Sequence, residues 1–383
     1  MRIAYLSGAH IPSRGANAVH VMRMCQAMAR LGHEVTLHAR PAGENAKGTA
    51  GSQTIAADDD FAFYGVERCF RIEKQPRPDV RVWGAFASAW RTRRAVLAGP
   101  RPDLIYVREV WSLALVADLG IPYVFESHWA PSHLPAWQRA MERALLKRAD
   151  CVRVVLISEA LRTIYSLDFP WLEASRTVVC HDGADAVPAT TTPRPVLGRR
   201  GALQVGYIGS FWPGYGVDVV EALARRMPHV DFHIVGGDPS QVATHQTSTA
   251  GVPNLRYHGF VAPSALPAIY ADLDVALAPY QAGTAHIGWI SPMKLFEYMA
   301  HGKAIVCSNF PVMAEIVEDG ATGLLVEPAS VDAWVGAVER LADADVRARM
   351  GTAARTRLED EFTWNTRASR ALRGLDGPLE RTP

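Results

Sequence analysis

The feature that most constrains the fold of this chain is a strand, a glycine-containing loop and a helix, which occur together in this order twice. The first copy has an apolar strand at residues 2–7, a loop at 8–17 and a helix at 18–31. Gly32 ends the helix, and a second strand follows at 34–39. Two strands joined through a helix form a βαβ unit, whose strands are parallel. The first copy therefore predicts a parallel sheet covered by helices.

The second copy opens with a strand at 204–208, a glycine loop at 209–216 and a further helix. Between the two copies, residues 187–201 are rich in Pro and Thr and show little periodicity, which is typical of a linker. A chain of 383 residues is long enough for two domains. We therefore expect an α/β protein with two doubly wound domains, at residues 1–186 and 202–360.

The most informative motif is SPMKLFEYMAHGK at residues 291–303. Ser291 suits the N-cap of a helix and Pro292 its first turn, so the helix start offers free N–H groups to an anion. Lys294 adds a positive charge there, and Glu297 lies one turn further on nearly the same face. A nucleoside diphosphate would meet both, through its phosphates and its ribose hydroxyls. The alternative is an ordinary capped helix with an internal Lys–Glu pair.

The position of this helix favours the binding site. A strand at 275–278 precedes it, and the connecting loop contains Gly283 and Gly288. In doubly wound domains, the loops at the carboxyl ends of the strands carry the ligand sites.

Residues 291–328 are similar to the donor-binding signature of the retaining family 4 glycosyltransferases. Other segments resemble the same family in the same order: the N-terminal glycine loop, FESH ending at His128, RALLKRADCVRVVLISEALR, VGYIGSFWPGYGVDVVEALA and DEFTWNTRA. The resemblance covers nearly the whole chain. It implies the GT-B fold, in which two Rossmann-like domains face each other across a cleft, the first binding the acceptor and the second the nucleotide sugar. It also implies that a final helix, at 361–376, packs back on the first domain.

The resemblance assigns roles by position. Glu297 would hold the ribose hydroxyls and Lys294 the donor diphosphate, while Gly15 would let the backbone approach the phosphate and sugar. His128 would lie beside the transferred sugar, and Val261 would flank the base. His128 also closes the buried strand YVFESH, where catalytic groups are commonly displayed. The alternative for His128 is a structural loop histidine.

Three positions depart from the family pattern. Trp289 stands where a glutamate usually contacts the donor sugar, and an indole offers only an N–H donor. In the loop opened by Gly209, Ser210 and Tyr215 occupy positions that commonly hold Arg and Lys. Two cations are thus absent from the expected phosphate site. Two outcomes stay open: Lys294, the helix start and Arg14 compensate for them, or donor binding is weak or lost.

The resemblance implies an enzyme that moves a hexose-type sugar from a nucleotide diphosphate, UDP rather than GDP, to an acceptor hydroxyl with retention of configuration. The acceptor would be a glycan, a glycolipid or a small molecule in polysaccharide, glycolipid or glycoconjugate biosynthesis. The departing diphosphate would help to take the acceptor proton, and no metal or other cofactor would be required. Two alternatives stay open: a non-catalytic relative that binds a nucleotide sugar or a partner, and a GT-B epimerase or phosphorylase.

Composition and spacing exclude several other classes. Forty Lys and Arg balance 39 Asp and Glu, which argues against a nucleic-acid partner. Five scattered cysteines without a CxxC pair predict neither a zinc site nor a disulfide framework and favour a reducing cytosol. Asp272 and Asp274 form a DxD pattern, but caps and turns explain it better than a metal does.

We expect a cytoplasmic protein. The N-terminus lacks the length and cleavage site of a signal peptide, and no apolar run reaches the roughly 18 residues that span a bilayer. The helix expected at 137–148 carries Arg139, Arg143 and Lys147 beside Trp137 and leucines. It suits peripheral contact with anionic lipid headgroups at the inner membrane surface, and the alternative is a solvated helix face.

Overall fold

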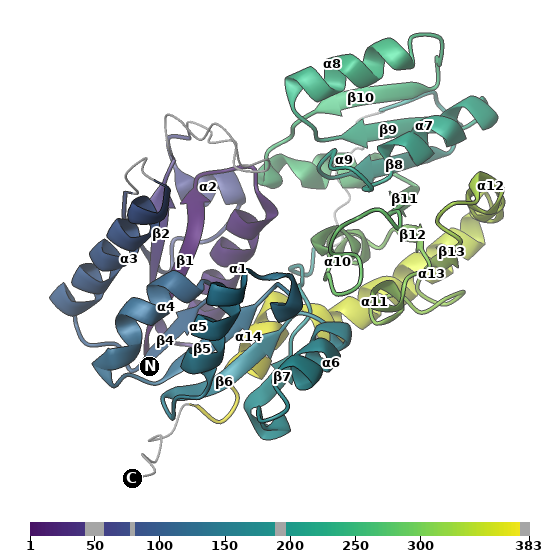
Figure 1. Cartoon of the computed structure of the whole chain (residues 1–383). Coiled ribbons are helices and arrows are strands. Elements are labelled where there is room, and N and C mark those ends of the chain that lie inside the picture. The colour runs from purple at the N-terminus through teal and green to yellow at the C-terminus, as the bar shows by residue number, and fades with distance from the viewer. Residues whose placement is uncertain (43–56, 77–80, 188–196, 376–383) are drawn as a thin grey trace. The chain divides into compact units, whose positions relative to one another are not determined.

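The computed structural model describes residues 1–42, 57–76, 81–187 and 197–375 (Figure 1). The chain divides into two compact units, of which one comprises residues 1–181 and 364–383 and the other residues 182–363. The first unit thus ends before the boundary predicted at residue 186. The reason is that the backbone of Asp182 donates to Ser291 Oγ and Ala184 forms a bridge with Thr363, so both belong to the second unit. Much of the predicted linker, residues 188–196, lies outside the described residues.

The first unit contains a seven-stranded parallel sheet in the order β3-β2-β1-β4-β5-β6-β7. Its strands are β1 (Arg2–Ile11), β2 (Glu34–Pro41), β3 (Arg71–Lys74), β4 (Leu104–Val107), β5 (Tyr123–Ser127), β6 (Cys151–Leu156) and β7 (Thr177–Val179). Its helices are α1 (Ala16–Arg30), α2 (Asp60–Tyr64), α3 (Arg81–Ala98), α4 (Val110–Val116), α5 (Ala136–Leu146), α6 (Glu159–Asp168) and α14 (Trp364–Leu372), with short 3-10 turns at Ala117–Leu119, Pro131–His133 and Ala174–Arg176.

The second unit contains a six-stranded parallel sheet in the order β10-β9-β8-β11-β12-β13. Its strands are β8 (Gln204–Ile208), β9 (Asp231–Val235), β10 (Leu255–Gly259), β11 (Val275–Ala278), β12 (Ala304–Ser308) and β13 (Leu324–Val326). Its helices are α7 (Val217–Arg226), α8 (Pro239–Ser248), α9 (Leu266–Asp272), α10 (Met293–Ala300), α11 (Pro311–Ala314), α12 (Val331–Arg340) and α13 (Ala344–Arg357), with a 3-10 turn at Pro263–Ala265 and a π-helical turn at Leu358–Phe362.

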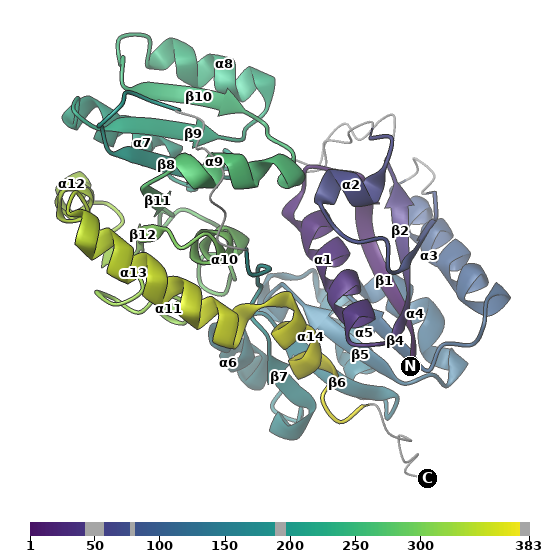
Figure 2. The same ribbon diagram turned by 180° about the vertical axis from the view of Figure 1, so that it is seen from behind.

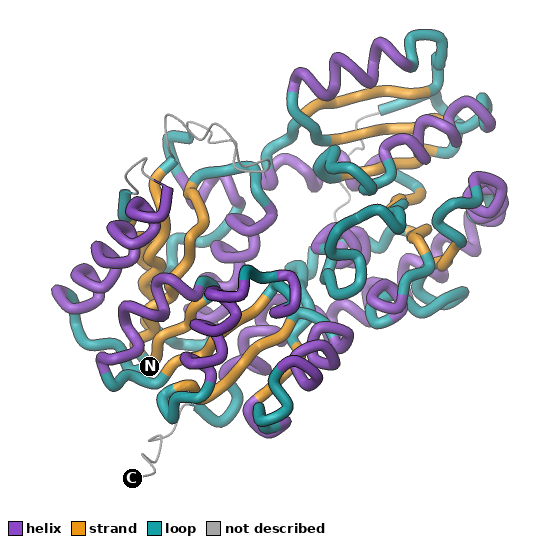
Figure 3. The backbone as a smooth tube through the Cα atoms, in the orientation of Figure 1, coloured by secondary structure: helices purple, strands orange, loops and turns teal. Residues whose placement is uncertain are grey.

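Strands and helices alternate along both units (Figure 3). The central strands are buried on both faces, which explains their nearly continuous apolar sequences. The predicted doubly wound α/β architecture is therefore confirmed. One expectation needs correction: β1 does not end at residue 7. It continues to Ile11 because His10 and Ile11 pair with the end of β2, at Arg40 and Pro41.

The strand order predicts the ligand-binding edge of each sheet by the same rule. The strand order reverses between β1 and β4 in the first unit and between β8 and β11 in the second. In doubly wound sheets, ligands bind outside the carboxyl ends of the strands at such a reversal. The loops after these four strands are therefore the first places to look for a site.

Candidate functional site

The ammonium group of Lys294 in the second unit is surrounded by aromatic rings. Lys294 projects from the first turn of α10, and its ammonium nitrogen is buried and has no hydrogen-bond partner among the described residues. Nζ lies 3.9 Å from the ring centre of Tyr207, 4.9 Å from that of Tyr280 and 5.6 Å from that of Tyr215. We call these three rings the tyrosine cage. Aromatic faces attract a cation but cannot replace the water or the anion that it has lost.

Three loops at the carboxyl edge of the second sheet close around this lysine. A Cβ added to Gly209 would lie 2.8 Å from Lys294 Nζ, so the absence of a side chain leaves room for the ammonium beside this loop. Gly216 has a φ of 82°, and a Cβ there would meet the carbonyl oxygen of Pro279 at 1.9 Å. A Cβ on Gly236 would lie 2.0 Å from the carbonyl oxygen of Gly209. The loops after β8, β9 and β11 are therefore packed too tightly for a side chain at Gly216 or Gly236.

Burial lowers the pKa of Lys294 from 10.5 to about 7. An anion beside the nitrogen would favour the charged form and raise that pKa again. The geometry therefore suits a group that supplies negative charge from outside the protein.

Glu297 lies one turn beyond Lys294 on α10 and is partly buried. In the part of the chain that the structure describes, Lys294 forms no ion pair with Glu297 or with any other carboxylate. The alternative of an internal Lys–Glu pair is therefore wrong.

The start of α10 differs from the sequence expectation. Ser291 does not cap the helix: its hydroxyl accepts a hydrogen bond from the backbone of Asp182, 2.8 Å away. Pro292 is the N-cap, without a side-chain hydrogen bond, and α10 begins at Met293. Trp289 is only 5% exposed, so little of its indole is accessible.

The other predicted donor residues lie on loops of the same unit. Ser210 is exposed, and its carbonyl oxygen accepts from the hydroxyl of Tyr207 at 2.6 Å. The hydroxyl of Tyr215 lies 3.2 Å from Nε2 of His286. Val261 is partly buried and follows the carboxyl end of β10. Neither Ser210 nor Tyr215 supplies a cation, so Lys294 is the cation that faces the glycine loop.

In the first unit, the predicted residues lie after β1 and β5. Gly15 is the N-cap of α1, where its carbonyl oxygen accepts from Ala18 and Val19, and Arg14 precedes it. His128 follows β5 and is partly exposed. Its Nε2 lies 2.6 Å from Glu126 Oε1 and 2.6 Å from Arg108 Nη2.

Glu126 is the centre of a buried cluster that sequence reasoning missed. Arg367 Nη1 lies 3.0 Å from its Oε2, and Arg108 Nε and His20 Nε2 lie 3.2 Å and 3.0 Å from its Oε1. The Tyr106 hydroxyl donates to the same carboxylate. Burial alone would raise the pKa of Glu126, but the charges of Arg367, His20 and Arg108 hold it well below its usual range. The carboxylate is therefore ionised.

His128 is affected in the opposite way. Burial and the charge of Arg108 lower its pKa to about 4, although Glu126 acts against them. The ring is therefore neutral at physiological pH. The one signal of this cluster in the sequence was a charged residue inside the buried strand YVFESH.

His20, Glu126 and His128 also bring three potential metal ligands within 4.8 Å of one another. The arrangement does not fit a metal ion, because the single negative charge of Glu126 is already paired with the guanidiniums of Arg108 and Arg367. A divalent cation would face two positive charges at this point.

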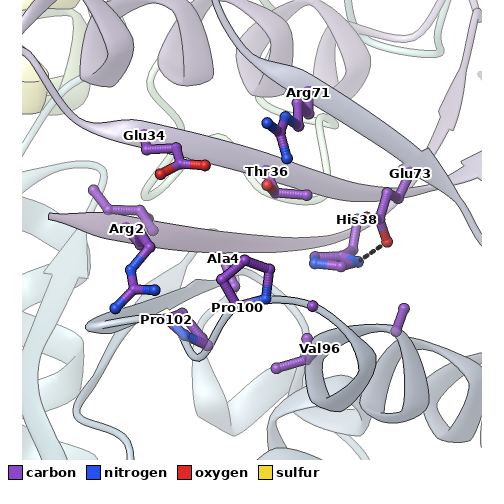
Figure 4. Close-up of a pocket in the computed structure, with 13 residues that line it drawn as sticks. Arg2, Ala4, Glu34, Thr36, His38, Arg71, Glu73, Val96, Pro100 and Pro102 are labelled. Atoms are coloured by element: carbon purple, nitrogen blue, oxygen red, sulfur yellow. Dashed lines mark ion pairs between the residues drawn. The ribbon is translucent and has the colours of Figure 1, made fainter.

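A separate cavity lies between β1, β2, β3 and the end of α3 (Figure 4). On its wall, Nδ1 of His38 lies 3.4 Å from a carboxylate oxygen of Glu73, and burial lowers the pKa of His38 to about 4, so the imidazole is neutral at physiological pH. Its volume is about 60 Å³. Ligand pockets usually measure roughly 300–1,000 Å³, so this cavity is too small for a nucleotide sugar.

Comparison with known proteins agrees with this geometry. The family described as "Glycosyltransferase Family 4" matches residues 18–187, and that described as "Glycosyl transferases group 1" matches residues 202–344. The chain is 27% identical over 356 residues to alpha-maltose-1-phosphate synthase of Mycolicibacterium smegmatis, which covers 82% of this chain and 89% of that protein.

A second relative is the GDP-mannose-dependent alpha-(1-6)-phosphatidylinositol monomannoside mannosyltransferase of the same species, 32% identical over 172 residues. That match covers 41% of this chain and 42% of the relative. The chain thus spans less than half the length of this relative and of another bacterial glycosyltransferase that it matches.

Among solved structures, Anabaena HepE in complex with UDP and glucose is similar over 99% of this chain and 100% of that one, with a TM-score of 0.73 and 18% identity. Such a likeness shows the fold. Together with the two family matches, it confirms the predicted GT-B architecture. The chain belongs to the GT4-like glycosyltransferases with the GT-B fold.

Proposed function

We propose that this protein transfers a hexose-type sugar from a nucleotide diphosphate to an acceptor hydroxyl. The observation that carries the proposal is the unpartnered ammonium of Lys294, which faces the glycine loop after β8. A diphosphate supplies the negative charge that this nitrogen lacks. Glu297 follows one turn later on α10, and its carboxylate would accept hydrogen bonds from ribose hydroxyls.

UDP is the donor nucleotide that we favour. One solved structure that is similar over 99% of this chain holds UDP and glucose, whereas the GDP-mannose-dependent relative matches less than half of its own length. The acceptor would be a glycan, a glycolipid or a small molecule.

The proposed reaction retains the anomeric configuration. Transfer would occur on one face of the sugar, with the departing diphosphate taking the acceptor proton. The protein would position the reactants and stabilise the charge on the leaving group. Because Lys294 supplies positive charge, the reaction needs no metal ion, and its rate should survive EDTA.

A thermal-shift screen of UDP-, GDP- and ADP-sugars tests the donor. A ligand at 100 times its Kd adds about 2.7 kcal/mol of stability. Release of nucleoside diphosphate with a panel of acceptors then separates an enzyme from a non-catalytic binder. NMR of the product reports the anomeric configuration and distinguishes transfer from epimerisation. No stabilisation by any nucleotide sugar would contradict the proposal.

We also propose peripheral contact with an anionic membrane surface. On α5, Trp137 is 52% exposed and Arg139 and Arg143 are exposed, as is Lys147 directly after the helix. In the described ranges, no helix is both long and apolar enough to cross a bilayer. Co-sedimentation should therefore occur with phosphatidylglycerol vesicles, weaken with salt and fall in Trp137→Ala. Equal binding to phosphatidylcholine vesicles would contradict a role for charge.

A further inference from the structure

The C-terminal helix contributes directly to the cluster around Glu126. Helix α14 belongs to the first unit and lies beside α1 (Figure 2). Arg367 on α14 donates from Nε to the carbonyl oxygen of His181 at 2.9 Å and from Nη1 to Glu126 at 3.0 Å. Trp364, one turn earlier, packs edge-on against His20 with ring centres 5.0 Å apart. Residues more than 200 positions apart thus meet at one carboxylate.

The carboxylate determines which nitrogen of His128 carries the proton. An ionised carboxylate can only accept hydrogen bonds, so the contact of 2.6 Å with Nε2 requires the proton on that nitrogen. The lone pair is then on Nδ1. Arg108 Nη2 lies 2.6 Å from Nε2 and 3.3 Å from Nδ1, and because a guanidinium only donates, its hydrogen bond to the ring in this tautomer goes to Nδ1. Because the ring is neutral at physiological pH, this choice of tautomer decides whether each nitrogen donates or accepts.

We propose that Glu126 is a positioning residue that holds His128 in its Nε2–H tautomer and in a fixed orientation, and that Arg367 of the C-terminal helix holds Glu126. The inference rests on the proposed function, in which His128 lies beside the transferred sugar. Glu126 itself is fully buried and acts through the imidazole. The C-terminal helix is then part of the transfer machinery of the first unit.

The decisive variant is Glu126→Gln, which preserves the shape of the side chain and removes its charge. A glutamine can donate from its amide to Nε2, so the Nδ1–H tautomer becomes available. In protein labelled with ¹⁵N-histidine, the wild type should show the Nε2–H form of His128. The variant should show a substantial population of the other form.

Catalysis should change with the tautomer. A misplacement of about 1 Å near the reacting groups can cost roughly 100-fold in rate, so we expect kcat to fall by roughly that factor in Glu126→Gln. Binding of UDP, which depends on the second unit, should stay within about twofold. A loss of UDP affinity equal to the loss of kcat would indicate general disruption and overturn the proposal.

Arg367 offers a second, independent test. Arg367→Lys keeps the positive charge and should retain the wild-type tautomer and much of the rate, whereas Arg367→Met should resemble Glu126→Gln. Arg373→Met is the matched control, since it removes an exposed cation that follows the same helix. These variants answer the question even if Glu126→Gln does not fold.

The two readouts separate this inference from the proposed function. The ¹⁵N spectrum is recorded without a sugar donor or acceptor substrate. It therefore tests whether Glu126 sets the tautomer of His128 even if no sugar transfer is detected. An unchanged His128 tautomer in folded Glu126→Gln, or in folded Arg367→Met, would overturn the inference.

Discussion

The two units bury charge in opposite ways. In the first unit, Glu126 is surrounded by Arg108, Arg367 and two imidazoles, and every charge has a partner from the protein itself. In the second, the nitrogen of Lys294 lies between the tyrosine cage and the glycine loop after β8, without a hydrogen-bond partner among the described residues. A satisfied cluster stabilises a fold and orients its members, whereas an unsatisfied charge stabilises whatever ligand completes it. The comparison supports the proposal that the first unit orients the reactants and that the second binds the donor.

The largest expected effect concerns the paired charges around Glu126 in the first unit. Glu126→Met leaves two guanidiniums buried without their carboxylate. Removing one partner of a buried ion pair typically costs about 3–5 kcal/mol. Urea unfolding followed by circular dichroism should show a loss of this size, and Arg373→Met should change little. A loss below about 1 kcal/mol would mean that the cluster does not stabilise the first unit.

Glu297→Ala should weaken binding of the nucleotide itself. Losing a hydrogen bond to a charged group costs about 1.5–3 kcal/mol, so the Kd for UDP should rise by roughly 10- to 150-fold. Calorimetry of the variant and the wild type measures this directly. Glu318→Ala, on an exposed turn of the same unit, is a suitable control. Unchanged affinity would move the ribose site away from α10.

The unsatisfied lysine predicts a pH dependence of donor binding. The pKa of Lys294 is about 7 in the free protein, and a bound diphosphate raises it. Affinity for a UDP-sugar should therefore be full below pH 7 and fall up to about tenfold per pH unit above it. Calorimetry between pH 6 and 9, in buffers of different ionisation enthalpy, should also show proton uptake on binding.

Lys294→Arg provides the control for that experiment, because a guanidinium stays charged throughout this pH range. Its binding should take up no proton and vary little with pH. An equal pH dependence in Lys294→Arg would assign the proton to another group.

The smallest expected effect has the opposite sign to that of Glu126→Met. Lys294→Met removes a buried polar group without a partner and should stabilise the protein by about 1–3 kcal/mol. The folded-state pKa lies below the unfolded value of 10.5, so the wild type gains stability as pH rises from about 7 toward 10.5. The advantage of the variant should thus be larger at pH 6 than at pH 9. Destabilisation by Lys294→Met at pH 6 would show that the amine has a partner in the native protein.

The sequence by itself determined the two parallel sheets and the helix that carries Lys294 and Glu297. The alternation of apolar strands, glycine loops and helices is a local pattern, and local patterns can be recognised in the amino-acid sequence alone. It also indicated the edge of each sheet where ligands bind, because that edge follows from strand order. The start of α10 was misplaced because the hydroxyl of Ser291 bonds to a residue more than 100 positions away.

Only the tertiary structure decided the surroundings of these residues. The tyrosine cage combines side chains from β8, the loop after it and the loop after β11, and Glu126 meets Arg367 across 241 positions of sequence. The sequence around one residue of such a pair does not reveal the other residue, because their contact depends on how the helices pack on the sheet. Whether a buried charge is satisfied or left open is therefore a property of the folded chain, because it depends on distances that no sequence spacing encodes.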